Sequence, residues 1–292
     1  MNSGAAGQRG GEAARRNVVT ILPAPLSERP AAPPPHWHLW IDETARPGWA
    51  NMAIDMALLD RAEQYGESWL RLYTWSPHCL SFGRHEPATR RYDLARISAL
   101  GLDTVRRPTG GRAVWHAREL TYAVAAPGAR FGTLAQAYAD IHRVLGEALS
   151  ELGAEVTLAP GAPTPGLGSG ACFARPVGGE VLVRGRKVIG SAQMRRGNAL
   201  LQHGSILLHD DQSVISQLEQ HSSFSPTACS SAGLTDHQGE QLEASAVAAV
   251  VARTVGCRWG GTWEQVTEPG FVLREAAAHF RWFASATWTW AR

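Results

Sequence analysis

The stretch Arg106-Arg107-Pro108-Thr109-Gly110-Gly111-Arg112-Ala113-Val114-Trp115-His116 is the most informative part of the chain. Its glycine pair follows a Pro-Thr step, and glycine lets backbone amides approach a ligand closely because it carries no Cβ. Three arginines crowd this loop with positive charge, and its histidine can donate or accept a proton near neutral pH. The stretch has neither the GK[ST] ending of a Walker loop nor the GxGxxG pattern of a dinucleotide fold. The stretch is a candidate ligand-binding loop, but the signal is weak by itself, because a Gly-Gly pair is more often an ordinary turn.

A second stretch holds the single lysine among 28 lysines and arginines. This lysine, Lys187, lies in Gly185-Arg186-Lys187-Val188-Ile189-Gly190-Ser191-Ala192-Gln193. Arginine does not deprotonate in proteins, so a lysine in an arginine-rich chain suggests acid–base chemistry, unless it survives by chance at the surface. The alternation of the stretch predicts a strand with Lys187, Ile189 and Ser191 on one face.

Two further stretches carry reactive side chains. Residues 159–170 (APGAPTPGLGSG) consist mainly of glycine and proline, and Cys172 follows them closely. A thiol at the end of such a loop can be exposed and reactive, although a single cysteine is more often a small buried side chain. Cys79, inside a predicted strand, fits the buried alternative better. The stretch Gln202-His203-Gly204-Ser205-Ile206-Leu207-Leu208 contains His203, which is either a site residue or a structural histidine.

The composition is typical of a globular protein, with 44% hydrophobic and 18% charged residues over 292 positions. A formal net charge of +2 gives no electrostatic footprint for nucleic acid or an anionic membrane. The four cysteines lie far apart, which argues against a structural zinc site or a disulfide framework and for a reduced, cytoplasmic compartment. No run of about 18 apolar residues and no apolar signal segment is present, so we expect neither a transmembrane helix nor secretion.

We expect a leader followed by one globular domain. Residues 1–35 are rich in Gly, Ala, Pro and Arg, which predicts a disordered leader, and residues 36–292 predict a single domain. Its core spans about 40–210, followed by a helical and aromatic segment at about 240–292. Periodicity predicts helices over 49–65, 92–100, 132–152 and 241–255, strands over 36–42, 69–75, 79–82 and 200–208, and a hairpin of 180–184 with 187–192. Because strands and helices mix without strict alternation, the fold class is α+β with a mixed sheet.

Taken in order, these stretches resemble the lipoate/biotin protein ligase superfamily. The resemblance runs from about Trp40 to Leu208 and also includes Asn51–Leu59, Glu119–Tyr122 and Ala171–Phe173. Within the superfamily, the chain is most similar to the cysteine-dependent octanoyl-[acyl carrier protein]:protein octanoyltransferases. The resemblance implies a catalytic domain of the class II aminoacyl-tRNA synthetase/biotin ligase type, with a mixed central sheet flanked by helices.

The resemblance implies an acyltransferase of protein lipoylation. An octanoyl group would pass from acyl carrier protein to Cys172 as a thioester, and then to a lysine of a lipoyl-domain protein such as the glycine cleavage H protein. Lys187 would lower the pKa of the thiol and relay a proton, and neither a cofactor nor a metal is implied. The implied substrate-binding positions are Arg107, Thr109, Gly110, Gly111, His116, Gly190, Ser191, Ala192, His203 and Gly204.

Three alternatives share these motifs: an ATP-dependent lipoate–protein ligase, an octanoyl amidotransferase acting between lipoyl domains, and a non-catalytic acyl-binding module. ATP-dependent ligases typically have a third loop glycine where this chain has Arg112, and an Asn-Asp pair ahead of the lysine strand that this chain lacks. Both departures favour the acyltransferase. The family commonly has Asp after the loop histidine, where this chain has Ala117, so the sequence assigns no partner that orients His116.

Overall fold

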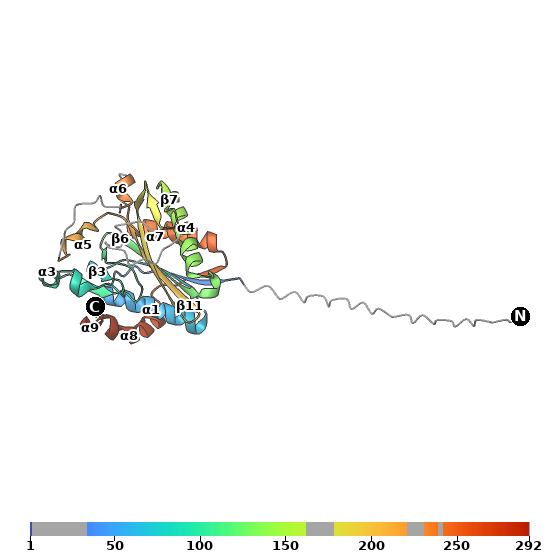
Figure 1. Cartoon of the computed structure of the whole chain (residues 1–292), viewed down its shortest axis with the longest axis horizontal. Helices are drawn as coiled ribbons and strands as arrows, with labels where there is room; N and C mark the ends of the chain where they lie inside the picture. Colours follow the sequence, from blue (N-terminus) through green and yellow to red (C-terminus); the bar gives the residue numbers. More distant parts are fainter. Residues whose placement is uncertain (2–33, 162–177, 221–230, 239–241, 292) are drawn as a thin grey trace. The chain divides into compact units, whose positions relative to one another are not determined.

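A six-stranded mixed sheet is the centre of the computed structural model, which describes residues 1, 34–161, 178–220, 231–238 and 242–291 (Figure 1). The strand β1 pairs in parallel with both of its neighbours, β2 and β12, whereas the other pairs are antiparallel. The fold is therefore α+β with a mixed sheet, as the sequence predicts. The strand order is β10 (Ile189–Arg196), β11 (Ala199–Leu207), β6 (Glu119–Pro127), β2 (Trp69–Tyr73), β1 (His36–Ile41) and β12 (Thr262–Gln265).

Helices cover both faces of this sheet. The helices α1 (Gly48–Tyr65) and α8 (Gly270–Phe283) pack together on one face, and α4 (Leu134–Glu151) and α7 (Ala244–Trp259) pack on the other (Figure 1). Successive side chains of β2 point to opposite faces of the sheet and therefore pack against different helix layers. Trp69 and Tyr73 join the core under α1, whereas Leu70 and Leu72 join the core under α4 and α7. Arg71 alternates with the second pair, which places a fully buried charge on the α1 side.

Two three-stranded sheets hold the ends of the glycine loop (residues 107–113) and the single lysine, whereas the stretch with His203 lies in the large sheet. The first has the order β4 (Asp103–Arg106), β3 (Cys79–Phe82) and β5 (Val114–His116), so it holds both ends of the glycine loop. The second has the order β7 (Val156–Leu158), β8 (Val181–Val183) and β9 (Arg186–Lys187), and it holds the lysine. The remaining short helices are α2 (Ala88–Arg91), α3 (Leu94–Ala99), the 3-10 turn η1 (Gly128–Arg130), α5 (Ser213–Gln217), α6 (Thr235–Gln238) and α9 (Ala286–Thr289).

The structure corrects two of the predicted elements. The helix expected over 92–100 begins at Leu94, because the Asp93 side chain caps it by accepting from a backbone N–H at 3.0 Å. The hairpin around Gly185 is confirmed as the antiparallel pair of β8 and β9. Its second arm is not one continuous strand, because the chain passes at Val188 from the small sheet into β10 of the large sheet. Lys187 therefore belongs to a different sheet from Ser191.

Residues 34–292 group into one unit. The expected leader lies almost wholly outside the described residues, so its disorder remains a prediction. None of the helices in the described parts of the chain has the length and apolar content that a bilayer crossing requires.

Candidate active site

A pocket lies where the large sheet meets the glycine loop. Helix α1 and strands β2, β5, β6, β10 and β11 all contribute to its walls. Seven of the predicted binding residues line it: Arg107, His116, Gly190, Ser191, Ala192, His203 and Gly204. The other lining residues are Met52, Tyr73, Trp75, Val114, Thr121 and Ser205. The pocket therefore gathers three stretches that are far apart in the sequence, while Thr109, Gly110 and Gly111 lie in the loop beside it.

The arginines of the loop hold its backbone in place. Arg107 donates from Nη1 to the Ser81 carbonyl at 3.1 Å, and from Nη2 to the carbonyls of Gly110 and Arg112 at 3.1 and 2.7 Å. The fully buried Arg106 donates to carbonyls outside the loop. Arg107 thus fixes the shape of the loop, and Arg106 ties the start of the loop to neighbouring segments. The charge pattern of the sequence does not indicate these roles.

The two loop glycines, Gly110 and Gly111, differ in backbone conformation and in the space around them. Gly111 has φ 90°, in the left-handed region that favours glycine. Its carbonyl also occupies the space that a Cβ on Gly83 would need, so Gly83 allows the two backbones to cross closely. A Cβ on Gly110 would meet no atom within 4 Å. The backbone conformation of Gly111 therefore favours glycine, whereas the position of Gly110 leaves room for a side chain.

His203 connects the loop to helix α1. Its Nε2 lies 2.7 Å from Thr109 Oγ1, and its Nδ1 lies 2.8 Å from Asp55 Oδ2. Because a carboxylate only accepts, Nδ1 carries the proton, and Nε2 accepts the hydroxyl proton of Thr109. Burial lowers the pKa of His203, although Asp55 acts in the opposite direction. The ring is therefore neutral near pH 7, and both of its nitrogens are engaged by protein groups.

His116 repeats the same arrangement on the other side of the loop. Its Nε2 lies 2.6 Å from Ser81 Oγ, and its Nδ1 lies 2.7 Å from Glu119 Oε1. The ring also stacks on Trp75 with 3.9 Å between the ring centroids. Glu119 thus orients His116, which the Ala117 position cannot do. Since both nitrogens are occupied, His116 offers the pocket no free base.

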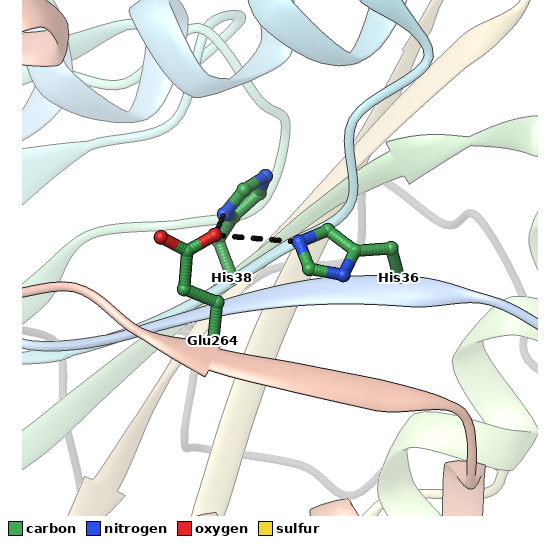
Figure 2. A group of neighbouring side chains, drawn as sticks. All are labelled: His36, His38 and Glu264. Carbon is green, nitrogen blue, oxygen red and sulfur yellow. Dashed lines mark ion pairs between the residues drawn. The ribbon is translucent and has the colours of Figure 1, made fainter.

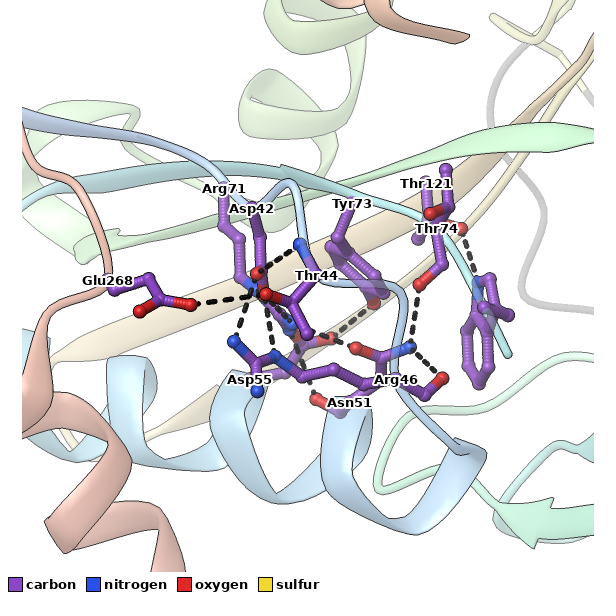
Figure 3. A network of polar contacts seen from close by, with 11 residues as sticks. Asp42, Thr44, Arg46, Asn51, Asp55, Arg71, Tyr73, Thr74, Thr121 and Glu268 are labelled. Atoms are coloured by element: carbon purple, nitrogen blue, oxygen red, sulfur yellow. Dashed lines mark hydrogen bonds and ion pairs between the residues drawn. The ribbon is translucent and has the colours of Figure 1, made fainter. Parts of the chain in front are cut away.

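A buried charge network supports Asp55 (Figure 3). Arg71 donates to Asp42 Oδ2 at 2.7 Å and to Asp55 Oδ1 at 3.1 Å, and the side chains of all three are fully buried. The Tyr73 hydroxyl donates to Asp55 Oδ2 at 2.9 Å. An unpaired charge in such a place is costly, so the Arg71 cation is what allows a carboxylate to remain next to His203.

Lys187 is buried rather than left at the surface. Its Nζ donates to Glu180 Oε1 at 2.6 Å, and the two side chains are only 1% and 4% exposed. The Tyr138 hydroxyl lies 3.5 Å from the same carboxylate oxygen. The alternative of a lysine that survives by chance on the surface is therefore wrong.

Ser191 connects the pocket to the neighbourhood of this lysine. His142 donates from Nδ1 to the Gly179 carbonyl at 2.8 Å, so its Nε2 accepts the Ser191 hydroxyl proton at 2.7 Å. Burial, with a smaller effect from a nearby cation, lowers the pKa of His142 to about 4, which keeps the ring neutral. Gln202 donates to the Tyr122 hydroxyl oxygen at 2.7 Å, and that hydroxyl lies 2.6 Å from Ser191 Oγ. The donors and acceptors of this series of hydrogen bonds are therefore assigned. The Ser191 hydroxyl has no proton left to donate to a ligand.

The predicted nucleophile Cys172 lies outside the described residues. The described residues on either side of its segment bind each other: Ala159 N donates to the Glu180 carbonyl at 2.8 Å, and Gly179 N donates to the Ala159 carbonyl at 2.9 Å. The two described ends of the segment therefore meet beside Glu180, the partner of Lys187.

Cys79 is fully buried, as the sequence predicts. Burial raises the pKa of its thiol well above the usual range, with a smaller contribution from Asp103. A thiol in this state is a poor nucleophile, because the thiolate is the reactive form.

Sequence reasoning missed five residues that complete the site: Asp55, Ser81, Glu119, His142 and Glu180. Two of them left a signal. Glu119 follows His116 across a two-residue turn between β5 and β6, so a His-x-x-Glu pattern where one strand follows another closely identifies it. Asp55 is a carboxylate inside the apolar stretch of α1. Ser81 left none, because a serine in a buried strand carries no distinctive pattern.

The family model of the lipoyl protein ligase A/B catalytic domain matches residues 47–254, and the chain belongs to this family. The predicted superfamily is thereby confirmed. The chain is 44% identical over 176 residues to the octanoyltransferase LipM of Carboxydothermus hydrogenoformans. It is 40% identical over 178 residues to the protein of the same name from Moorella thermoacetica. Each match covers 59% of this chain and 65% of the relative, so the chain spans less than two thirds of these relatives.

Solved structures agree on the fold. A putative lipoate protein ligase of T. acidophilum with bound lipoic acid superimposes with a TM-score of 0.74 over 88% of this chain and 99% of that chain. Lipoate-protein ligase A bound with ATP gives a TM-score of 0.72 over 89% and 99%. Both are 18% identical to this chain, so they show a shared architecture alone.

Proposed function

We propose that this chain is a protein octanoyltransferase. It transfers an octanoyl group from octanoyl-acyl carrier protein, through a thioester on Cys172, to a lysine of a lipoyl-domain protein such as the glycine cleavage H protein. The reaction needs a reduced thiol, which suits a cytoplasmic protein.

One observation supports this function above the others: a pocket built from the motifs of the family lies close to a buried lysine. Seven predicted binding residues line the pocket, and the Ser191–His142 chain leads from it toward the turn that precedes Glu180. The similarity to two octanoyltransferases named LipM gives the acyl group its proposed identity.

In the first half-reaction, the Cys172 thiolate attacks the carbonyl carbon of the octanoyl thioester. A carbon–sulfur bond forms to Cys172, the bond to the carrier's thiol breaks, and that thiol leaves as a thiolate that takes up a proton. One thioester replaces another, so the exchange is nearly isoenergetic and requires no ATP. A cation near the nucleophile favours its thiolate form, and Lys187 is the residue that we assign to this role.

In the second half-reaction, the amine of the acceptor lysine attacks the octanoyl-Cys172 carbonyl. An amide forms, the Cys172 thiolate leaves, and one proton moves from the amine to that thiolate. Lys187 relays this proton, which arginine could not do. Glu180, bound to Lys187 Nζ at 2.6 Å, positions the ammonium for both steps.

The acyl tail occupies the apolar part of the pocket. Met52, Tyr73, Trp75 and Val114 supply carbon-rich surface there, while the polar atoms of the histidines are bound to protein groups. Burial of a C8 chain contributes roughly 5 kcal/mol at about 0.8 kcal/mol per CH₂. Chains shorter by two carbons should therefore react more slowly by about an order of magnitude.

The test supplies the full-length chain with three donors in separate reactions. These are octanoyl-acyl carrier protein without ATP, free octanoate or lipoate with ATP, and an octanoylated lipoyl domain without ATP. Intact mass spectrometry of a second, unmodified lipoyl domain then reports the product. We expect acylation from octanoyl-acyl carrier protein alone, and its loss in Cys172→Ala but not in Cys257→Ala, which removes another thiol.

Each alternative function has its own outcome. Product formed only with ATP and a free acid would establish a lipoate–protein ligase, a name that structures of the same fold carry. Product formed only from the octanoylated lipoyl domain would establish an amidotransferase. Binding of octanoyl-acyl carrier protein without any product would leave an acyl-binding module.

A further inference from the structure

Two histidines and a glutamate converge on the edge of the large sheet, away from the pocket (Figure 2). His36 and His38 stand two residues apart on β1, so their side chains leave the same face of the strand. The neighbouring strand β12 runs parallel, and Glu264 is directly opposite His38 in the register. Among the described residues, this is the group of three whose ligand atoms lie within 4.8 Å of one another.

The distances in this cluster suit a small metal ion. Glu264 Oε2 lies 3.4 Å from His36 Nε2 and 3.4 Å from His38 Nδ1. In a tetrahedral zinc site with bonds of about 2.0–2.1 Å, neighbouring ligand atoms are about 3.3–3.4 Å apart. Two edges of such a tetrahedron are therefore already present, and the exposed His36 ring can rotate to close the third.

The surroundings of the two rings leave the nitrogens that face Glu264 available. Thr262 Oγ1 lies 2.9 Å from His36 Nδ1, so a proton donated there leaves the lone pair on Nε2. The His38 ring stacks on Trp69 at 4.3 Å between centroids, which fixes its plane. His38 Nδ1 is shielded from solvent and makes no hydrogen bond to the described residues.

We propose that His36, His38 and Glu264 bind one divalent transition-metal ion of the Zn²⁺ type, with water completing its coordination. Imidazole nitrogens with one carboxylate oxygen are ligands that Zn²⁺ accepts, whereas Ca²⁺ and Mg²⁺ prefer oxygen alone. The ion would join β12, which lies late in the chain, to β1 at the start of the domain.

This site is structural and separate from the acyl pocket. His38 pairs with Trp69 at the start of β2, whereas Tyr73, at the other end of that strand, lines the pocket. Four residues of strand separate them, which is about 13 Å. The proposal does not depend on the proposed function, because it concerns stability and metal binding rather than acyl transfer.

Calorimetric titration of the chelator-treated, full-length chain with Zn²⁺ tests the proposal. We expect one ion per chain and, at about ten times Kd, a rise in Tm of a few degrees. The variants Glu264→Gln and His36→Gln change partly exposed side chains, so they should fold normally and bind Zn²⁺ at least tenfold more weakly. His78→Gln, an exposed histidine elsewhere, is the matched control and should bind as the wild type does.

Titration with Co²⁺ distinguishes this site from a cysteine site. Two imidazoles and a carboxylate give d–d absorption bands without the thiolate-to-cobalt charge-transfer bands that cysteine ligands produce. The proposal is overturned if Zn²⁺ neither binds nor raises Tm, if Glu264→Gln and His36→Gln bind as tightly as His78→Gln, or if thiolate bands appear. In those cases the cluster is a pair of surface His–Glu contacts.

Discussion

The histidines that line the pocket, His116 and His203 (the histidine side), hold their protons differently from the neighbouring pair of Lys187 and Glu180 (the lysine side). On the histidine side, His116 and His203 each lie between a carboxylate and a hydroxyl, so all four ring nitrogens are engaged. On the lysine side, the buried Lys187 ammonium donates to the Glu180 carboxylate, beside the described ends of the segment that carries Cys172. The rings on the histidine side are therefore held in place and have no nitrogen free for proton transfer. We assign proton transfer to the lysine side.

The charges behind the two histidines also differ. Asp55 is paired with Arg71, whereas the described contacts of Glu119 are His116 and the hydroxyls of Thr121 and Ser205. A full cation thus balances one carboxylate, whereas hydrogen bonds are the described contacts of the other. The stability of the histidine side should accordingly depend most on Arg71.

Removal of Arg71 should have the largest effect. Arg71→Ala leaves the buried carboxylates of Asp42 and Asp55 without their shared cation, so unfolding free energy should fall by about 3–5 kcal/mol. Arg46→Ala is the matched control: it removes a partly exposed partner of Asp42 and should cost about 1 kcal/mol or less. Urea denaturation compares the two, and equal losses would show that the buried network does not anchor the histidine side.

On the lysine side, His142 should make stability depend on pH. Its folded-state pKa of about 4 lies below the ordinary 6.5, so the unfolded chain binds the proton first as the pH falls. The stability that the neutral ring provides is complete above about pH 6.5 and is lost progressively toward pH 4, by up to about 3 kcal/mol. Stability curves of His142→Gln should be flatter in this window than those of the control His78→Gln. Parallel curves for the two variants would mean that His142 titrates normally.

Lys187→Arg should separate the two half-reactions. Arginine preserves the charge but cannot relay a proton, so transfer to the acceptor lysine should slow by about 10²-fold, while formation of the octanoyl-enzyme suffers less. The octanoyl-enzyme should then accumulate, which single-turnover mass spectrometry detects. Arg186→Lys, the adjacent and partly exposed position, should keep wild-type kinetics. A fully active Lys187→Arg would move the proton relay away from the lysine side.

The smallest expected effect concerns the glycine loop. Gly111 has φ 90°, so Gly111→Ala should cost about 1–2 kcal/mol, whereas Gly110→Ala meets open space and should be nearly neutral. Thermal denaturation measures the difference, with far-UV circular dichroism to confirm that the fold is retained. If Gly111→Ala leaves the unfolding free energy unchanged, the loop can adapt to a side chain at this position and does not require glycine.

Local patterns in the sequence predicted most of the fold. The helix over 132–152 and the strand over 200–208 appear as α4 and β11, because period 3.6 and period 2 follow directly from burial of one face. The passage at Val188 between two sheets was not predictable, since alternation continues through a strand that changes partners. Strand pairing is a long-range property, and no local pattern encodes it.

The residues of the site were predicted better than their roles. His116 and His203 were recognised as candidates, but their partners Glu119 and Asp55 are brought to them by tertiary structure. A histidine with both nitrogens occupied is identical in sequence to one with a free nitrogen. The sequence could therefore indicate which residues gather at the pocket, but not which of them hold a proton in place.

The location of the octanoyl thioester tests the central claim most directly. The full-length chain is incubated with octanoyl-acyl carrier protein and no acceptor, digested, and mapped by mass spectrometry before and after hydroxylamine treatment. We predict one hydroxylamine-labile octanoyl group on Cys172, formed at a comparable rate in Cys79→Ser if that variant folds. An adduct on Cys79, or acceptor octanoylation at the wild-type rate by Cys172→Ala, would contradict the account.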